Sequence, residues 1–196
     1  PQAQIISRLS QLEKTGHSPE KLQIIVIGGT FSAYPDNYKK SFLKAIFDTC
    51  NNAEILLNQQ NSKTPRHPGE VKQPKDLSQN KNVVISSERS KVEKSSNNIK
   101  LTTPETIEDS QKLNQSAKYR IIGMSIETCP DWINKKEIKL LRKYGVTKVQ
   151  IGVQALDEKI LKAIKRGHSL DAIANATRLL RNAGFKINYH FMPNLP

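Results

Sequence analysis

Apolar runs typical of buried strands alternate with helical patterns along most of this chain, and that alternation constrains the fold more than any other feature. The runs occupy about 22–27, 119–126, 147–153 and 186–191, and most are rich in β-branched residues. Strands that alternate with helices predict right-handed βαβ crossovers and a parallel sheet. Near-continuous apolar runs further predict strands buried on both faces. With four clear strands, we expect the sheet to be part of a larger one.

Capping residues predict where the intervening helices begin and end. Gly16 follows a helical pattern at 4–15, in the position where a glycine commonly ends a helix. The expected N-caps are Thr103, Asn134, Asp157 and Ser169. Pro104 follows Thr103 and suits the first helical position of a helix running to about 117.

The segment 51–101 differs in character from the sequence on either side of it. Asn, Ser, Lys, Gln and Pro dominate it, and its short apolar pieces at 55–57 and 83–85 are too isolated to build a layer. Such a segment does not bury enough apolar surface to offset its ordering entropy. We therefore expect a low-complexity, mostly disordered insertion at 51–101 between the first part of one domain, 1–50, and its continuation, 102–196.

Composition narrows the classes of function. The net charge of +13 favours a polyanionic partner such as nucleic acid, although a basic surface without a partner would look the same. No apolar run approaches the roughly 20 residues that span a bilayer, so we expect no membrane association and a cytoplasmic location. The two cysteines, Cys50 and Cys129, exclude a disulfide scaffold and a complete iron–sulfur site within this chain.

Polar or glycine residues follow the expected strands at their carboxyl ends. Gly28-Gly29-Thr30 would let the backbone approach a ligand closely, and Glu127 and Gln154 each end a strand. Each has an ordinary structural interpretation as a tight turn, a loop cap or a loop anchor. Because carboxyl strand ends form the active edge of both barrels and open α/β sheets, their joint placement predicts a functional rim.

Four further residues are candidates with common structural explanations. Arg166 and His168 flank Gly167 at a helix end, where cations complement the helix dipole. His190 lies within the last strand, where a buried, hydrogen-bonded histidine is usual, and Lys21 precedes the first strand as a surface lysine would. The sequence has no P-loop, no G-x-S-x-G motif and no histidine pair at metal-binding spacing.

Seven motifs, in this order, resemble the radical S-adenosylmethionine (SAM) domain of the catalytic subunit of Elongator, a tRNA wobble-uridine modifying enzyme. The resemblance covers nearly the whole chain outside 51–101. The motifs are Gly-His-Ser-Pro-Glu-Lys (16–21), Gly-Gly-Thr-Phe-Ser-Ala-Tyr-Pro (28–35), Ile-Glu-Thr-Cys-Pro-Asp-Trp (126–132), Ile-Gly-Val-Gln (151–154), Arg-Gly-His-Ser (166–169), Ala-Gly-Phe-Lys (183–186) and His-Phe-Met-Pro-Asn-Leu-Pro (190–196).

The resemblance implies a partial (βα) barrel of radical SAM type, with a 4Fe-4S cluster and S-adenosylmethionine as cofactors. It also implies acetyl-CoA and tRNA as substrates, because this family uses a 5′-deoxyadenosyl radical to add an acetyl-CoA-derived group to C5 of uridine 34. Elongator-like partner subunits or a homodimer are expected on the same ground.

Individual roles follow from the matching motifs. By resemblance, Gly28, Gly29 and Thr30 contact the methionyl end of SAM. Glu127, Gln154 and Arg166 lie near its ribose and carboxylate. The resemblance places His190 and Met192 in the lining of the cavity, and it matches Lys21 to the family lysine that contacts acetyl-CoA.

The chain departs from the family pattern in two respects. The cluster-binding cysteines and the acetyltransferase-like domain are absent from it, and Cys129 stands where the family has arginine. We therefore expect a fragment of a tRNA uridine(34) acetyltransferase that is inactive alone. Two alternatives are another radical SAM enzyme, resembling coproporphyrinogen oxidase, and a non-catalytic tRNA-binding module whose binding would depend on salt.

Overall fold

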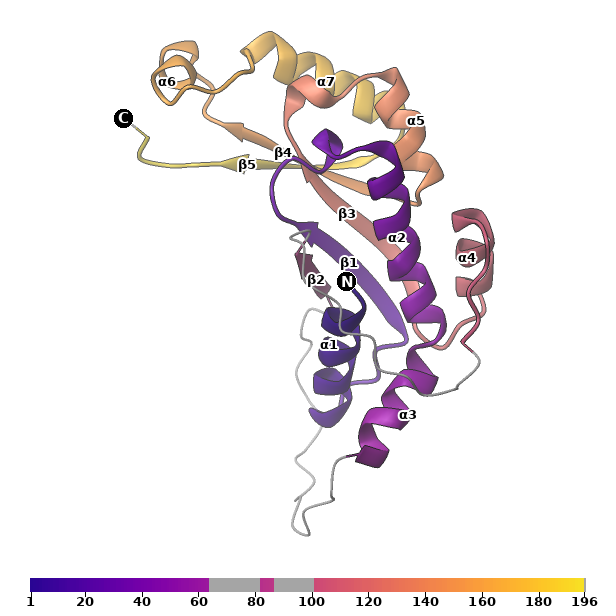
Figure 1. Ribbon diagram of the computed structural model, residues 1–196. Helices are drawn as coiled ribbons and strands as arrows, with labels where there is room; N and C mark the ends of the chain where they lie inside the picture. Colours follow the sequence, from indigo (N-terminus) through magenta and orange to yellow (C-terminus); the bar gives the residue numbers. More distant parts are fainter. Residues whose placement is uncertain (64–81, 87–100, 196) are drawn as a thin grey trace.

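A five-stranded parallel sheet forms the centre of the protein (Figure 1). The computed structural model describes residues 1–63, 82–86 and 101–195. The strands are β1 (Lys21–Ile27), β2 (Asn82–Ser86), β3 (Arg120–Thr128), β4 (Lys148–Gln154) and β5 (Lys186–Phe191). Their order across the sheet is β2-β1-β3-β4-β5, and each neighbouring pair is parallel. The parallel α/β architecture expected from the alternating pattern is thus confirmed.

Helices and short 3-10 turns connect the strands. The α-helices are α1 (Gln2–Lys14), α2 (Asp36–Asn51), α3 (Ala53–Lys63), α4 (Ile107–Asn114), α5 (Lys135–Lys143), α6 (Glu158–Ala163) and α7 (Leu170–Asn182). Two 3-10 helices, η1 (Phe31–Ala33) and η2 (Pro130–Trp132), follow β1 and β3. None of the helices in the described part of the chain is both long enough and apolar enough to cross a membrane.

Among the described residues, one face of β1 is buried and the other is more exposed, which corrects the expectation that its apolar run is buried on both faces. Along β1, Leu22, Ile24 and Val26 are at most 1% exposed, whereas Ile27 is 43% exposed on the other side. Successive side chains of a strand point to opposite faces, so the pairing register identifies which residues share a side. We call the less covered side the open face; its residues are Gln23, Ile25, Ile27, Ser125, Glu127, Lys148, Gln150, Lys186, Asn188 and His190.

Most of the expected helix limits are confirmed. The side chains of Asn134, Asp157 and Ser169 each accept a hydrogen bond from the backbone of the first turn of α5, α6 and α7. Thr103 is not an N-cap, because α4 begins at Ile107 and the hydroxyl of Thr106 accepts the capping hydrogen bond from the Asp109 N–H. The Thr106 hydroxyl also donates a hydrogen bond to Asp109 Oδ2. The Thr-Pro-Glu sequence three residues earlier had favoured a helix start at Thr103 instead.

Two parts of the segment 51–101 are ordered, so the expectation that its short apolar pieces would join no layer is wrong. Helix α3 occupies 53–63 and buries Leu57, which is 2% exposed. Strand β2 pairs with β1 at the edge of the sheet and buries Ile85 completely. The remaining residues for which disorder was expected, 64–81 and 87–100, lie outside the described residues.

Hydrogen bonds from Asn52 hold together the two ends of this segment. Asn52 Nδ2 donates to the Thr102 carbonyl, and the Thr102 N–H donates back to Asn52 Oδ1, both over 2.8 Å. A second asparagine, Asn114, is 3% exposed and ties α4 to Asn51 on α2 and to the backbone of β3. The segment therefore begins and ends at a fixed point beside the core.

Candidate functional site

The turn that follows β1 exposes bare backbone at the carboxyl edge of the sheet. Gly28 and Gly29 both have positive φ, 133° and 86°, which L side chains rarely adopt. A Cβ built on Gly29 would meet no atom within 4 Å, so open space adjoins this residue. Peptide groups there can approach a ligand closely, as the sequence predicted for Gly28-Gly29-Thr30.

A side-chain contact joins this turn to the end of β3. Thr30 Oγ1 lies 3.0 Å from Cys129 Sγ, and both residues are half-buried. The carboxyl ends of β1 and β3 therefore meet at the rim. Cys129 stands where the resemblance expects arginine, and here its thiol contacts the Gly-Gly-Thr turn.

The end of β4 places a strained glutamine at the same edge. Gln154 has a φ of 70°, and its side chain is buried with Oε1 lacking any hydrogen-bond partner in the structure. Gly152 leaves room beside it, because a Cβ there would lie 3.0 Å from Gln154 Nε2 and the amide would have to shift. The Met192 N–H donates to the Gln154 carbonyl over 3.0 Å, which brings Met192 to this strand end as well.

Gln154 Oε1 is not alone, since Thr128 Oγ1 at the end of β3 is also buried without a partner. Buried polar atoms in native proteins are almost always hydrogen-bonded, and exceptions commonly mark a ligand or water site. A non-glycine residue held in the left-handed region costs of order 1 kcal/mol and such residues cluster at functional sites. Both observations indicate a binding function for this rim.

Below the rim, four side chains of the open face form one polar network. Gln150 Nε2 donates to Ser125 Oγ over 2.8 Å, and Gln150 Oε1 lies 2.7 Å from His190 Nε2. The other ring nitrogen, His190 Nδ1, lies 3.4 Å from Glu127 Oε1. Because Gln150 Nε2 donates to Ser125, its Oε1 is left to accept a hydrogen bond from His190 Nε2.

Sequence reasoning identified Glu127 and His190 but missed Ser125 and Gln150. These two residues are small or uncharged, and within a strand pattern they look like interruptions of an apolar run. Their alternation with Ile126 and Ile151 was the available signal, because it places them on the face opposite the core. Only the register of β3, β4 and β5 shows that they lie beside Glu127 and His190.

Other predicted residues lie elsewhere. His168 is buried and its Nε2 lies 3.4 Å from the Val153 carbonyl, which agrees with a structural role. Arg166 is half-buried after α6, and in the described part of the chain its guanidinium has no hydrogen bond or ion pair within bonding distance. Lys21 begins β1, six residues before Ile27, which places it about 20 Å from the Gly-Gly-Thr turn at a strand's rise per residue.

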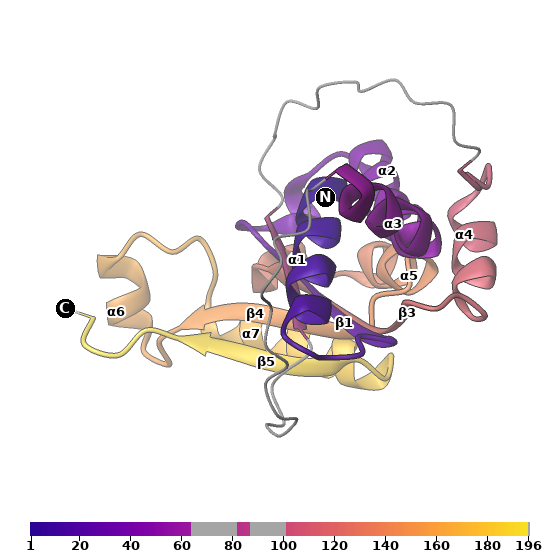
Figure 2. The ribbon, with the colours of Figure 1, turned by 90° about the horizontal axis from the view of Figure 1, so that it is seen from below.

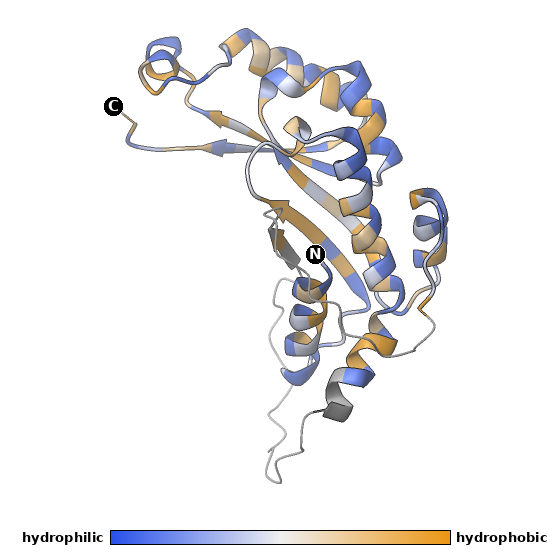
Figure 3. Cartoon of the chain, in the orientation of Figure 1, coloured by the Kyte–Doolittle hydropathy of each residue, from blue (hydrophilic) through white to orange (hydrophobic). Residues whose placement is uncertain are grey.

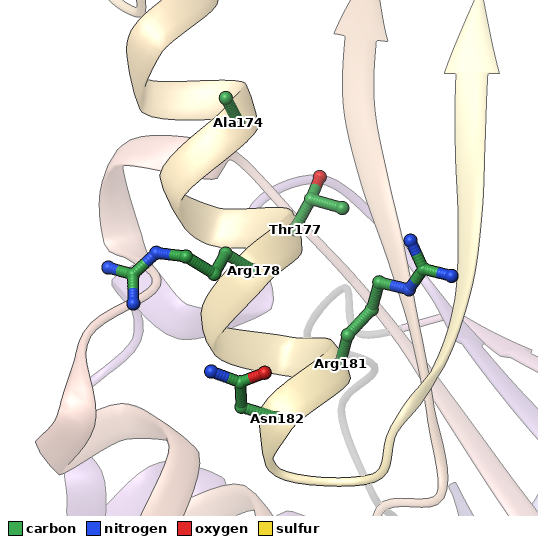
Figure 4. Close-up of a pocket in the computed structure, with 5 residues that line it drawn as sticks. All are labelled: Ala174, Thr177, Arg178, Arg181 and Asn182. Carbon is green, nitrogen blue, oxygen red and sulfur yellow. The ribbon is translucent and has the colours of Figure 1, made fainter.

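A surface hollow of about 530 Å³ lies along α7, away from the rim (Figure 4). Ala174, Thr177, Arg178, Arg181 and Asn182 line it, and none of the residues predicted for the site is among them. The side chains of Thr177 and Tyr189 are hydrogen-bonded over 3.0 Å between α7 and β5. This hollow and the polar strand ends are therefore separate features.

The cysteines do not form a metal site in the described residues. Burial raises the pKa of the Cys50 thiol to about 12, and a thiol must be deprotonated to bind metal. Within 1–63, 82–86 and 101–195, no group of three or more His, Cys, Asp or Glu side chains is arranged to hold a metal ion.

Comparisons with known proteins relate the chain to one family. A family model described as the Radical SAM superfamily matches residues 8–196. A tRNA uridine(34) acetyltransferase of Methanocaldococcus infernus is 33% identical over all 196 residues, which are 28% of its length. Elongator complex protein 3 of Homo sapiens is 28% identical over the whole chain and 27% of its own length.

A solved structure agrees in fold. The archaeal Methanocaldococcus infernus Elp3 with its N-terminal residues 1–46 deleted superposes with a TM-score of 0.71 at 31% identity. The match covers 97% of this chain and 33% of that one. The chain therefore spans between a quarter and a third of the length of the relatives it matches.

Proposed function

Because this chain belongs to the radical SAM superfamily, we propose that its strand-end rim binds SAM and that it forms part of a tRNA-modifying enzyme. The superfamily uses SAM together with a 4Fe-4S cluster. The reaction we assign is the addition of an acetyl-CoA-derived carboxymethyl group to C5 of wobble uridine 34. Elongator-like partner subunits or a homodimer, and a cytoplasmic location, belong to the same proposal.

The observation that supports SAM binding is the meeting of bare backbone and unpaired polar atoms at one rim. The backbone of residues 28–30 can hydrogen-bond the carboxylate and amino groups of a methionyl moiety. The unpaired Gln154 Oε1 can accept a hydrogen bond from a ribose hydroxyl. Glu127, His190 and Met192 lie beside this rim, and Arg166 and Lys21 keep the roles that the resemblance gives them as proposals.

The described residues thus fit SAM, and they do not supply the thiolates that a cluster requires. When bound, SAM supplies the radical for hydrogen abstraction, and the chain's own residues bind and orient it. His190 can hold a proton on Nε2 against Gln150 and present Nδ1 to Glu127. We propose that the chain by itself does not turn over.

The names of the relatives support the choice of substrate. Curated relatives from archaea and animals are called tRNA uridine(34) acetyltransferase or Elongator complex protein 3. None of these names favours the coproporphyrinogen oxidase-like alternative. The net charge of +13 fits a tRNA partner in either an enzyme or a binding module.

Two glycines in the same backbone conformation allow a sharp test of the rim. Gly29 and Gly16 have φ of 86° and 82°, and a Cβ on either would meet nothing within 4 Å. Changing either one to alanine therefore adds the same left-handed strain, of about 1 kcal/mol. We expect Gly29→Ala to weaken SAM binding at least about tenfold in equilibrium dialysis, because only Gly29 lies at the rim, while Gly16→Ala leaves the affinity unchanged.

The strained Gln154 gives a second test with its own control. Gln154→Gly and Lys165→Gly each relieve a positive φ, of 70° and 56° respectively. Both are expected to be neutral or stabilising in thermal unfolding, since glycine adopts this conformation freely. Gln154→Gly should nevertheless lose SAM affinity, because it removes the unpaired amide. Equal SAM binding by all four variants would contradict the proposed rim.

Activity is tested in the full-length gene product. After anaerobic cluster reconstitution, incubation with SAM, tRNA and acetyl-CoA should yield 5′-deoxyadenosine and modified uridine 34. Binding of tRNA with neither product would instead support the non-catalytic tRNA-binding module.

A further inference from the structure

Four strands of the sheet begin with a cation. Lys21, Arg120, Lys148 and Lys186 are the first residues of β1, β3, β4 and β5. The pairing register joins them in twos, Lys21 with Arg120 and Lys148 with Lys186. In the described part of the chain, no carboxylate oxygen lies within 4.0 Å of any of the four, although seven ion pairs occur elsewhere.

The pair Lys148 and Lys186 lies on the open face. Their neighbours Val149 and Ile187 pack toward the core, and side chains alternate along a strand, so both lysines project from the opposite side. Parallel neighbours lie about 4.8 Å apart, and like charges directly opposite each other on adjacent strands are destabilising. The two lysines therefore lie on neighbouring strands of one face, and no carboxylate of the described residues neutralises them.

The neighbours of the two lysines extend this site toward the polar network. Ser125 pairs with Lys148 in register, and Gln150 and Asn188 lie two residues further along β4 and β5. Glu127 is the one acidic side chain among the strand residues of the open face as defined above, and it already contacts His190. Figure 3 shows the polar character of the end of β5 in contrast with apolar β1.

We propose that Lys148 and Lys186 bind a phosphate group of the substrate on the open face. Two ammonium groups on adjacent strands can each donate charge-assisted hydrogen bonds to one phosphate or diphosphate. The ligand class is a phosphate ester, which both coenzyme A and the RNA backbone provide. This inference rests on the proposed function only in naming coenzyme A and RNA as the two sources of the phosphate.

The test uses the 196-residue chain and two double variants of equal charge. Lys148→Gln with Lys186→Gln removes the pair and lowers the net charge from +13 to +11. Lys135→Gln with Lys139→Gln makes the same change of two charges on α5, where both lysines are exposed. Calorimetric titration with inorganic pyrophosphate should show at least about a tenfold loss of affinity for the first variant and less than about a twofold change for the control.

Two further arms identify the source of the phosphate. The variants are also titrated with coenzyme A and with a single-stranded RNA oligonucleotide. The Lys148/Lys186 variant, but not the control, should lose affinity for one of these two ligands, and that ligand is the source of the phosphate. Thermal unfolding supplies a separate measurement: without anions the Lys148/Lys186 variant should melt at or above the wild type, and pyrophosphate should raise the melting temperature of the wild type more than that of the variant.

Equal losses in both double variants would mean that only bulk charge matters, and would overturn the inference. A lower melting temperature for the Lys148/Lys186 variant without ligand would overturn it too, because the lysines would then be structural. Measuring SAM binding separates a failure of this inference from a failure of the proposed function, because the lysine pair lies away from the rim. If the protein binds SAM normally but the two double variants bind pyrophosphate equally well, only the phosphate site is refuted.

Discussion

Lys39 is an almost fully buried cation at the contact between α2 and α5. Its Nζ lies 2.8 Å from Glu137 Oε2 and 3.1 Å from Asp36 Oδ1, and its side chain is 2% exposed. Burial alone would lower the pKa of Lys39, but hydrogen bonds and charges from Glu137 and Asp36 outweigh it and raise that pKa. The hydrogen bond from Lys39 in turn lowers the pKa of Asp36.

Replacing Lys39 should therefore destabilise the fold more than replacing an exposed lysine. Lys39→Met leaves the buried Glu137 without a cation and should lower the free energy of unfolding by about 3–5 kcal/mol, and adding Glu137→Leu should restore most of it. Lys118→Met, which removes an exposed pair with Glu54, should cost no more than about 1 kcal/mol. Urea unfolding followed by circular dichroism measures all three. A similar small loss for Lys39→Met and Lys118→Met would contradict the buried role.

The same pair of shifts fixes the sign of the pH dependence. Because the pKa of Asp36 is lowered in the folded state, its contribution is complete above its ordinary value of 3.8 and is lost as pH falls through the folded pKa. Because the pKa of Lys39 is raised, its contribution is complete below 10.5 and is lost as pH rises through the folded pKa. The contribution of the Lys39–Asp36 ion pair to the stability of the wild type, measured by urea unfolding across pH, should thus be flat between these limits and shrink beyond both.

At the scale of elements, β2 is a five-residue strand that extends the sheet beyond β1 (Figure 1). Helices α1, α2 and α3 contact one another and lie together over β1 (Figure 2). Ile85 is fully buried, and β2 also contacts α1. Ile85→Ala should lower the free energy of unfolding by about 2–5 kcal/mol because it leaves a cavity in the core. Ile122→Ala on β3 is the matched control, since Ile122 is 55% exposed and its loss should be within about 0.5 kcal/mol. Equal losses in urea unfolding would show that β2 does not pack as described.

The strand that sequence patterns missed and the strands they found differ in what specifies them. Strands β1, β3, β4 and β5 have apolar patterns, most of them rich in β-branched residues, and helix caps between them, so local sequence predicts both their existence and their carboxyl ends. Strand β2 has three apolar residues in polar surroundings, and its place at the sheet edge comes from pairing with β1. The burial of the open face was overestimated for the same reason, because an apolar run in the sequence does not indicate how many faces of the strand are covered.

Site residues divide in a similar way. Gly28, Gly29, Thr30, Glu127 and Gln154 were predictable because each ends a strand, where parallel sheets gather polar groups. Contacts such as Thr30 with Cys129, and the network through Ser125 and Gln150, depend on register between strands that are far apart in sequence. Local patterns contain no information on register, so these contacts required the fold.

For the whole molecule, charge and architecture divide the sheet into two functional edges. The carboxyl edge has glycines and unpaired neutral polar atoms, which suit a small polar cofactor. The amino ends of four strands have cations, which suit phosphates. The proposed function uses both edges, and the two binding reactions should respond differently to salt.

Binding of tRNA by the chain should therefore weaken steeply with ionic strength, while SAM binding should not. A protein that neutralises about six to ten phosphates loses roughly 10³–10⁵ in affinity between about 50 and 200 mM salt, because condensed counterions are released on binding. The 31 basic residues against 18 acidic ones make such a footprint available. Filter binding with an unmodified tRNA across a salt series, beside SAM dialysis at the same concentrations, measures both slopes. A logarithmic slope for tRNA near zero, or one equal to that of SAM, would show that the excess charge does not serve nucleic-acid binding.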